Sequence, residues 1–147
     1  MTVPTLEPVV VSVFVKAQPA RAFEAFTAEM TGWWPLAEIS ITKPERVVVE
    51  GREGGEIYEV NGEDRHHWAW ITAWEPPRRL AVEWKVDAEA PASTAWEATF
   101  AAEDGGTRLT LVHSGWEALG ESAAASRDGY DGGWAGVLAR YVTYLNG

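Results

Sequence analysis

The first quarter of the chain has the spacing of a strand followed by an amphipathic helix. Val9–Val15 is rich in β-branched and aromatic residues, which favour a strand. Pro19 suits the first turn of a helix, where its missing N–H costs nothing. Phe23, Phe26 and Met30 follow at spacings of three and four, which predicts an apolar stripe along that helix.

Between residues 46 and 114 the pattern changes to short strands separated by turns. The breaks contain turn-forming pairs such as Asn61-Gly62 and Pro76-Pro77. Strands joined this tightly are antiparallel, because a parallel pair needs a long crossover connection. The predicted strands are Arg46–Glu50, Glu56–Val60, His66–Trp74, Leu80–Val86, Thr94–Ala102 and Thr107–Ser114.

The last segment returns to helical spacing. Trp134, Leu138, Tyr141 and Leu145 step by four, three and four residues, and Asp131 has the side chain of an N-cap, which predicts a helix from Asp131 to Leu145. The element order predicts an α+β fold in which a curled antiparallel sheet of about seven strands holds the long C-terminal helix, with one or two short helices after the first strand. A ligand cavity is expected between the sheet and that helix.

Composition and charge exclude several classes of function. The 147 residues suit a single domain over 1–147, and the absence of cysteine excludes disulfides, thiolate metal sites and cysteine nucleophiles. The net charge of −10 disfavours nucleic acid and anionic membrane surfaces as partners. Val9–Val15, the longest apolar stretch, is far too short to span a bilayer, and no targeting segment is visible. We therefore expect a soluble, cytoplasmic protein.

The three histidines are the candidate metal ligands and acid–base groups. His66 and His67 are adjacent on a strand and point to opposite faces, so they cannot easily chelate one ion together, and we expect no metal site. His113 lies on an apolar strand face. Three roles fit this position: a structural side chain, a polar anchor for a ligand, or an acid or base. We expect no catalytic residue and no cofactor, since the pattern assigns the strand carboxylates to solvent: Glu56, Glu59, Glu83, Glu97 and Glu103.

Six phrases in the chain resemble a known family. They are PARAFEAF (Pro19–Phe26), TGWWP (Thr31–Pro35), GGEIY (Gly54–Tyr58), WEPPRRLAVEW (Trp74–Trp84), GTRLTLVHSG (Gly106–Gly115) and GGWAGVL (Gly132–Leu138). In this order they resemble the START-like (helix-grip, Bet v 1-like) superfamily, and within it the homologues of the C-terminal domain of the heat-shock protein 90 ATPase activator. The resemblance implies one START-like domain with an apolar cavity under its C-terminal helix. It implies no single function, because the superfamily includes carriers, cyclases and co-chaperone domains.

Alternation along the strands predicts the lining of that cavity. The apolar faces of the last three strands should look at the helix. The strand His66–Trp74 is largely apolar on both faces, and we place Trp68 and Trp70 on the inner one. The predicted lining residues are Trp68, Trp70, Trp84, Trp96, Phe100, Leu111, His113, Trp134, Leu138 and Tyr141. So many aromatic side chains favour planar or ring-containing ligands.

Three functions fit these observations. The leading hypothesis is non-catalytic binding of a small apolar or aromatic molecule in the cavity. The second is a cyclase or dehydratase, with His113 as the best acid or base. The third is a chaperone-interacting module with an exposed patch around Trp33, Trp34 or Trp116, although 147 residues leave no room for the additional domain of the two-domain activator. A homodimer is left open.

Overall fold

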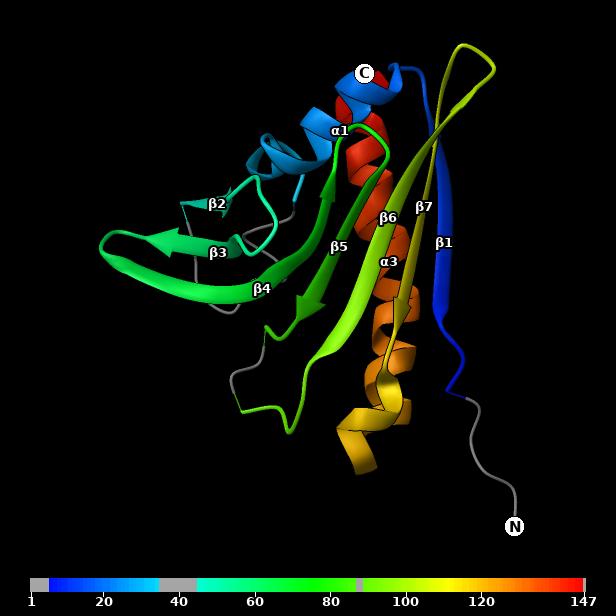
Figure 1. Ribbon diagram of the computed structural model, residues 1–147. Helices are drawn as coiled ribbons and strands as arrows, with labels where there is room; N and C mark the ends of the chain where they lie inside the picture. Colours follow the sequence, from blue (N-terminus) through cyan, green and yellow to red (C-terminus); the bar gives the residue numbers. More distant parts are fainter. Residues whose placement is uncertain (1–5, 35–44, 87–88, 147) are drawn as a thin grey trace.

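The computed structural model describes residues 6–34, 45–86 and 89–146 and contains one seven-stranded sheet (Figure 1). The elements in chain order are β1 (Val9–Val15), α1 (Pro19–Thr27), the 3-10 turn η1 (Met30–Gly32), β2 (Arg46–Val49), β3 (Glu56–Asn61), β4 (Asp64–Glu75), β5 (Arg79–Trp84), β6 (Thr94–Glu103), β7 (Gly106–Ser114), the 3-10 segment η2 (Trp116–Ser122) and α3 (Ala123–Asn146). The predicted strands all form, with bounds that differ by at most two residues.

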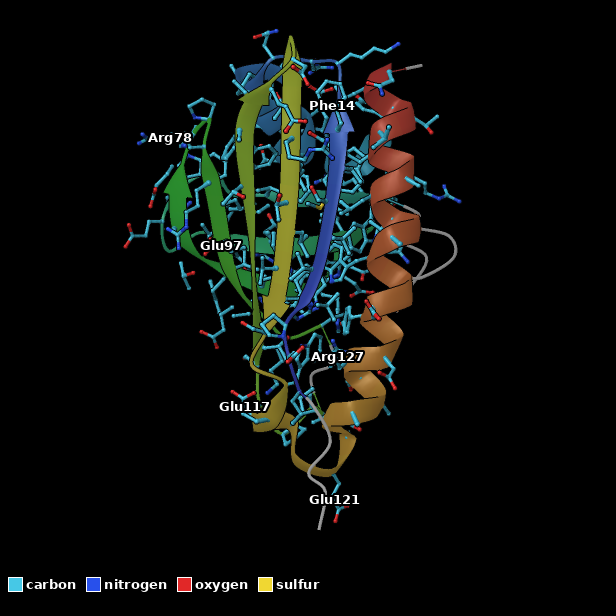
Figure 2. All side chains as sticks on the ribbon, turned by 90° about the vertical axis from the view of Figure 1, so that its right-hand side faces the viewer. Phe14, Arg78, Glu97, Glu117, Glu121 and Arg127 are labelled. Carbon is cyan, nitrogen blue, oxygen red and sulfur yellow. The ribbon has the colours of Figure 1, made fainter. Side chains whose placement is uncertain are left out.

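The sheet is antiparallel throughout, in the order β1-β7-β6-β5-β4-β3-β2. Strands β2 to β7 pair in sequence order, and β1 joins the far edge beside β7. The sheet curls so that α3 lies along its inner side, with α1 near the C-terminal end of that helix (Figure 1). Turned by 90°, the structure shows α3 running the length of β1, with Arg127 near its first turns (Figure 2). This confirms the predicted helix-grip α+β fold.

The C-terminal helix begins earlier than its sequence indicates. α3 starts at Ala123 and includes Gly129, Gly132 and Gly133, so the prediction that Asp131 caps its N-terminus is wrong. Each interior glycine costs about 1 kcal/mol relative to alanine in a helix. The glycines from 129 to 133 therefore weaken the local helix signal in the second and third turns, and α3 as a whole packs against η2 and β1.

Two extra residues in β4 change which side chains face inward. Trp68 is the extra residue in the pairing with β3, and Thr72 is the extra residue in the pairing with β5. Each such bulge shifts the alternation of side chains by one position. Trp68 is buried, whereas Trp70 is 48% exposed and lies against the ring of His67, with the ring centres 4.9 Å apart. The prediction that Trp70 faces the cavity is therefore wrong.

Phe26 is the centre of the core between α1, the sheet and α3. Its side chain is fully buried, and its ring centre lies 5.2 to 6.0 Å from the rings of Trp33, Trp96, Phe100 and Tyr141. Most of these contacts are edge-to-face, the arrangement that aromatic quadrupoles favour. The aromatic core therefore joins all three layers at this end of the molecule.

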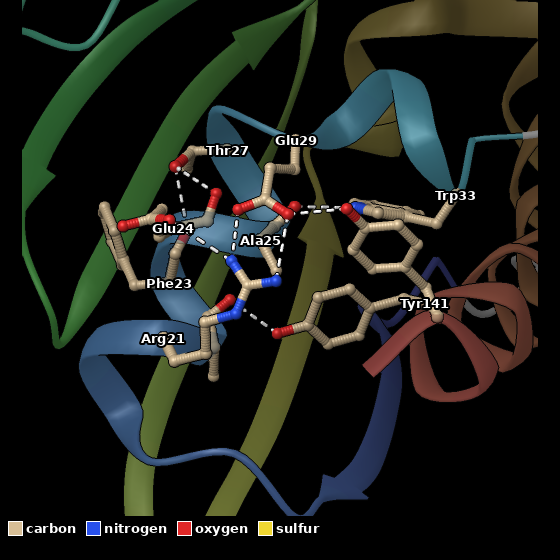
Figure 3. Close-up of polar contacts among 10 residues, drawn as sticks. Arg21, Phe23, Glu24, Ala25, Thr27, Glu29, Trp33 and Tyr141 are labelled. Carbon is tan, nitrogen blue, oxygen red and sulfur yellow. Dashed lines mark hydrogen bonds and ion pairs between the residues drawn. The ribbon is translucent and has the colours of Figure 1, made fainter. Parts of the chain in front are cut away.

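Polar contacts hold the end of α3 against α1 (Figure 3). Arg21 forms an ion pair with Glu29, and Tyr144 donates a hydrogen bond to the same carboxylate at 2.5 Å. These donors lower the pKa of Glu29 to about 2. Beside them, the hydroxyl of Tyr141 donates to the backbone oxygen of Ala22 at 2.6 Å. The main cavity lies along the other half of α3.

Candidate functional site

The described residues form a cavity of about 380 Å³ between the sheet and α3. This volume is within the range of small-molecule sites, roughly 300 to 1,000 Å³. Apart from indole N–H groups, the only polar side chains among its described lining residues are Ser126 and Tyr130. The lining residues are Trp34, Trp68, Trp84, Val86, Ser126, Gly129, Tyr130, Gly133, Trp134 and Val137.

Four tryptophans from four parts of the chain supply most of this lining. Trp34 follows η1, Trp68 is on β4, Trp84 ends β5 and Trp134 is on α3. Their rings form a closed cycle of contacts, with ring centres 4.9 Å (34–68), 5.8 Å (68–84), 6.1 Å (84–134) and 6.0 Å (134–34) apart. Neighbouring planes are inclined by 46° to 79°. Nε1 of Trp34 is buried and has no hydrogen-bond partner among the described residues.

Glu59 supports Trp68 from behind the cavity. Its side chain is 1% exposed, and its Oε1 accepts a hydrogen bond from Nε1 of Trp68 at 2.7 Å. The prediction that Glu59 faces solvent is wrong, because it shares the inner face of β3 with the fully buried Ile57. A buried carboxyl group is costly without partners, so this hydrogen bond also offsets part of the burial of Glu59.

His113 supports Trp134 in a similar way. The histidine is fully buried, and its Nδ1 accepts a hydrogen bond from Nε1 of Trp134 at 3.0 Å. Nε2 therefore carries the proton and donates to Oγ1 of Thr94 at 2.6 Å. Burial lowers the pKa of His113 to about 3, so the ring is neutral. Both nitrogens are used by the protein, which gives His113 a structural position rather than contact with the cavity.

Trp84 and Tyr130 separate the main cavity from a smaller one. Nε1 of Trp84 donates to the hydroxyl oxygen of Tyr130 at 2.9 Å, and both residues line both cavities. The second cavity has a volume of about 260 Å³ and includes Lys85, Glu89 and Thr94. The two cavities therefore meet at this hydrogen-bonded pair.

Two glycines keep the helix side of the main cavity open. Gly129 and Gly133 lie one turn apart on α3 and line the cavity, whereas Gly132 and Gly136 do not. A Cβ atom placed at any of the four would meet no atom within 4 Å. Larger side chains at the two lining positions would therefore reduce the space without clashing with the fold.

Three of the ten predicted lining residues lie on the cavity wall: Trp68, Trp84 and Trp134. Trp70 lies on the outer face of the sheet, as described above. The remaining six are buried in the core: α1 packs against Phe100 and Tyr141 at one end of the sheet, whereas His113 is covered by Trp116 of η2 and Tyr130 of α3. They are Trp96, Phe100, Leu111, His113, Leu138 and Tyr141.

Sequence reasoning missed the other seven lining residues. Ser126, Gly129, Tyr130, Gly133 and Val137 have the three- and four-residue spacing of one helix face, which a helix beginning at Ala123 would have revealed. The remaining two are Trp34, which has no periodic neighbours, and Val86, which lies two residues beyond the end of β5.

Trp33, Trp34 and Trp116 do not form the exposed patch that a chaperone-interacting module would show. Trp33 and Trp116 are 3% and 0% exposed, and Trp34 contributes to the cavity. Nε1 of Trp33 donates to the backbone oxygen of Ala25, and Nε1 of Trp116 donates to that of His113. Their hydrogen bonds and burial make them part of the packed interior.

Neither a metal cluster nor a spanning helix is found within residues 6–34, 45–86 and 89–146. In these ranges no three histidine, aspartate or glutamate side chains gather closely enough to hold an ion. No helix there is both long and apolar enough to cross a membrane.

Solved structures with the same fold cover almost the whole chain. Protein MLL2253 from Mesorhizobium loti is 17% identical, with a TM-score of 0.72 over 94% of this chain and 96% of that one. The Aha1 dimer from Colwellia psychrerythraea is 16% identical, with a TM-score of 0.69 over 95% and 96%. Txn09, an anthrahydroquino-γ-pyrone synthase, is 28% identical, with a TM-score of 0.66 over 97% and 100%.

The family is decided by the match to a whole-family model. No curated protein is significantly similar to the chain. The model of the Activator of Hsp90 ATPase homolog 1-like protein family matches residues 16–146, which include every element from α1 to α3. The chain therefore belongs to the Activator of Hsp90 ATPase homolog 1-like protein family.

Proposed function

We propose that this protein binds a small ring-containing apolar molecule in the cavity between the sheet and α3, without chemical conversion. The observation that carries the proposal is the cycle of four tryptophan rings on the wall of a cavity of about 380 Å³. An engineered apolar cavity of about 150 Å³ accommodates one benzene ring. The volume here therefore suits a molecule of two or three fused rings.

The chemistry of the lining supports binding rather than catalysis. General acid–base catalysis needs a titratable group within hydrogen-bond reach of the substrate. Among the described lining residues there is no aspartate, glutamate, histidine or lysine, and the one titratable side chain is Tyr130, whose hydroxyl oxygen accepts a hydrogen bond from Nε1 of Trp84. His113, the candidate acid or base, is neutral and has both nitrogens bonded to Trp134 and Thr94.

The test uses a matched pair of glycine variants. Gly133→Leu should fill the cavity, and Gly132→Leu should leave it open while adding the same side chain to the same helix. Saturable quenching of tryptophan emission by a panel of planar polycyclic compounds would measure affinity. We expect Gly133→Leu to weaken binding at least tenfold, a cost of about 1.4 kcal/mol, and Gly132→Leu to leave it unchanged. Equal affinity of the two variants would place the ligand elsewhere.

A cyclase is the second candidate, because Txn09 is a synthase and is 28% identical over nearly the full length of both chains. In that case the tryptophan wall would fold a reactive chain into a ring-forming conformation. Mass spectrometry and NMR of the ligand recovered from the protein separate the two functions. If the compound recovered is the same as the compound added, the result supports binding alone. If the recovered compound has gained a ring and lost water, the result supports cyclisation.

The Aha1 protein from Colwellia psychrerythraea is described as a dimer. As part of the proposal, the present chain also forms a homodimer. Sedimentation equilibrium tests it, and a single species at the monomer mass over the full concentration range would contradict it.

A further inference from the structure

We propose that the main cavity selects ligands that carry a quaternary ammonium group on an aromatic or apolar body. The proposal rests on the proposed function, because it names the ligand class of the same cavity. The feature behind it is the aromatic wall, defined as Trp34, Trp68, Trp84, Tyr130 and Trp134.

The aromatic wall has the composition that attracts organic cations. A cation over the face of an aromatic ring is attracted by the ring quadrupole, most strongly for tryptophan. Four of the five wall residues are tryptophans, and neighbouring indole planes are inclined by 46° to 79° rather than stacked. Stacked rings would cover one another's faces, whereas an inclined pair covers fewer of them, and each of these rings lines the cavity. A compact cationic group can then contact more than one ring.

Three of the four indole N–H donors on the wall, which would otherwise bind an anion or a carbonyl, are bonded to the protein, and the fourth, Nε1 of Trp34, is buried without an acceptor among the described residues. Nε1 of Trp68 donates to Glu59, that of Trp84 to Tyr130, and that of Trp134 to His113. The positive edges of three indoles are thus occupied by protein acceptors. No lysine, arginine or histidine is among the described lining residues of this cavity.

The same hydrogen bonds favour a cation in a second way. An acceptor bonded to an indole N–H polarises the ring and makes its face more negative. The carboxyl group of Glu59 acts on Trp68, and the neutral ring of His113 acts on Trp134. The chain as a whole has a net charge of −10, which adds a negative potential at its surface.

The scarcity of polar side chains favours a quaternary ammonium over a primary one. A primary ammonium group has three N–H donors that need acceptors when buried. Besides the indoles, only Ser126 and Tyr130 among the described lining residues carry polar side chains. A quaternary group has no N–H and exposes methyl groups that pack against ring faces.

The ligand test compares benzyltrimethylammonium with neopentylbenzene, which has the same shape with carbon in place of nitrogen, and with benzylammonium. Affinity is measured by quenching of tryptophan emission and by calorimetry. We expect the quaternary cation to bind about tenfold more tightly than the neutral compound, within the range of desolvated cation–π contacts. We expect benzylammonium to bind more weakly than the quaternary cation.

The outcomes distinguish this inference from the proposed function. Equal or tighter binding of neopentylbenzene, or tighter binding of benzylammonium, overturns the ammonium preference and leaves aromatic binding intact. Absence of binding by these compounds and by the polycyclic panel overturns both.

A variant pair tests whether the aromatic wall produces the preference. Trp34→Leu keeps an apolar side chain and leaves no acceptor unpaired, because Nε1 of Trp34 has no partner. Trp70→Leu makes the same change on the outer face of β4. We expect the preference for the cation to fall at least threefold in Trp34→Leu and to stay unchanged in Trp70→Leu, with thermal melts to confirm folding. An unchanged preference in both variants overturns the role of the wall, and if Trp34→Leu does not fold, the ligand series on the unmodified protein decides.

Discussion

Acidification from about pH 7.5 to about pH 5 should destabilise the protein through His113. Burial lowers the pKa of this residue from 6.5 to about 3 in the folded chain. The unfolded chain therefore binds a proton near pH 6.5 that the folded chain does not take up until about pH 3. The stabilising effect of neutral His113 is complete above pH 6.5 and is lost as the pH falls from 6.5 towards 3.

The size of the effect follows from this difference. Well below pH 6.5, each further pH unit lowers the free energy of unfolding by about 1.4 kcal/mol. Because about 1.5 units of the interval lie below pH 6.5, the free energy of unfolding should fall by roughly 2 kcal/mol between about pH 7.5 and about pH 5. The pKa of Glu29, lowered to about 2, acts at lower pH and does not enter this interval. Comparison with a variant that does not titrate at position 113 then isolates the contribution of His113.

The assay is urea unfolding at several pH values for the unmodified protein and for His113→Asn. Asparagine keeps an acceptor for Nε1 of Trp134 but does not titrate. The variant should be less stable at neutral pH and should lose less stability on acidification. If the free energy of unfolding fell equally with pH in the two proteins, His113 would not be buried in its neutral form. If the variant does not fold, NMR titration of the three histidine rings decides, since the ring of His113 should remain neutral at pH 5.

Three other predictions concern stability. Leu138→Ala should cost about 2 to 5 kcal/mol by urea unfolding, because Leu138 is fully buried under the sheet; a loss below about 1 kcal/mol would mean that this helix face is not packed. Glu29→Gln should reduce the loss of stability that the unmodified protein shows as the pH falls from about 4.5 to about 2, because the pKa of Glu29 is lowered by Arg21; an unchanged decrease of the melting temperature over this pH range would contradict this ion pair. Trp70→Ser should change stability by no more than about 0.5 kcal/mol and should leave ligand affinity unchanged, and a large loss of either would show that this half-exposed ring has a partner.

Local patterning was enough to predict the architecture. Alternation with period two, turn pairs such as Asn61-Gly62 and the four-three-four spacing after Trp134 are properties of neighbouring residues, and they indicated the strands, their antiparallel order and a helix held by the sheet. The six phrases in family order predicted the same fold. Burial of Leu138 and Tyr141 also followed, because an apolar helix face has to be covered.

Contacts between distant segments decided the site. Bulges at Trp68 and Thr72 depend on how β4 pairs with both neighbours, so alternation alone placed Trp70 on the wrong face. The glycines of α3 between residues 129 and 133 weaken its local helix signal, and the helix packs against η2 and β1, which lie elsewhere in the chain.

The cavity itself is a consequence of how completely each part of the sheet is covered. Phe23 and Phe26 of α1 fill the space over Phe100, whereas near Trp84 the helix α3 contributes Gly129 and Gly133 to the cavity wall and the gap remains open. An inward position can be predicted from a strand pattern. Elements far apart in the chain decide whether a packed helix or an empty space lies opposite that position. Only the tertiary structure contains this information.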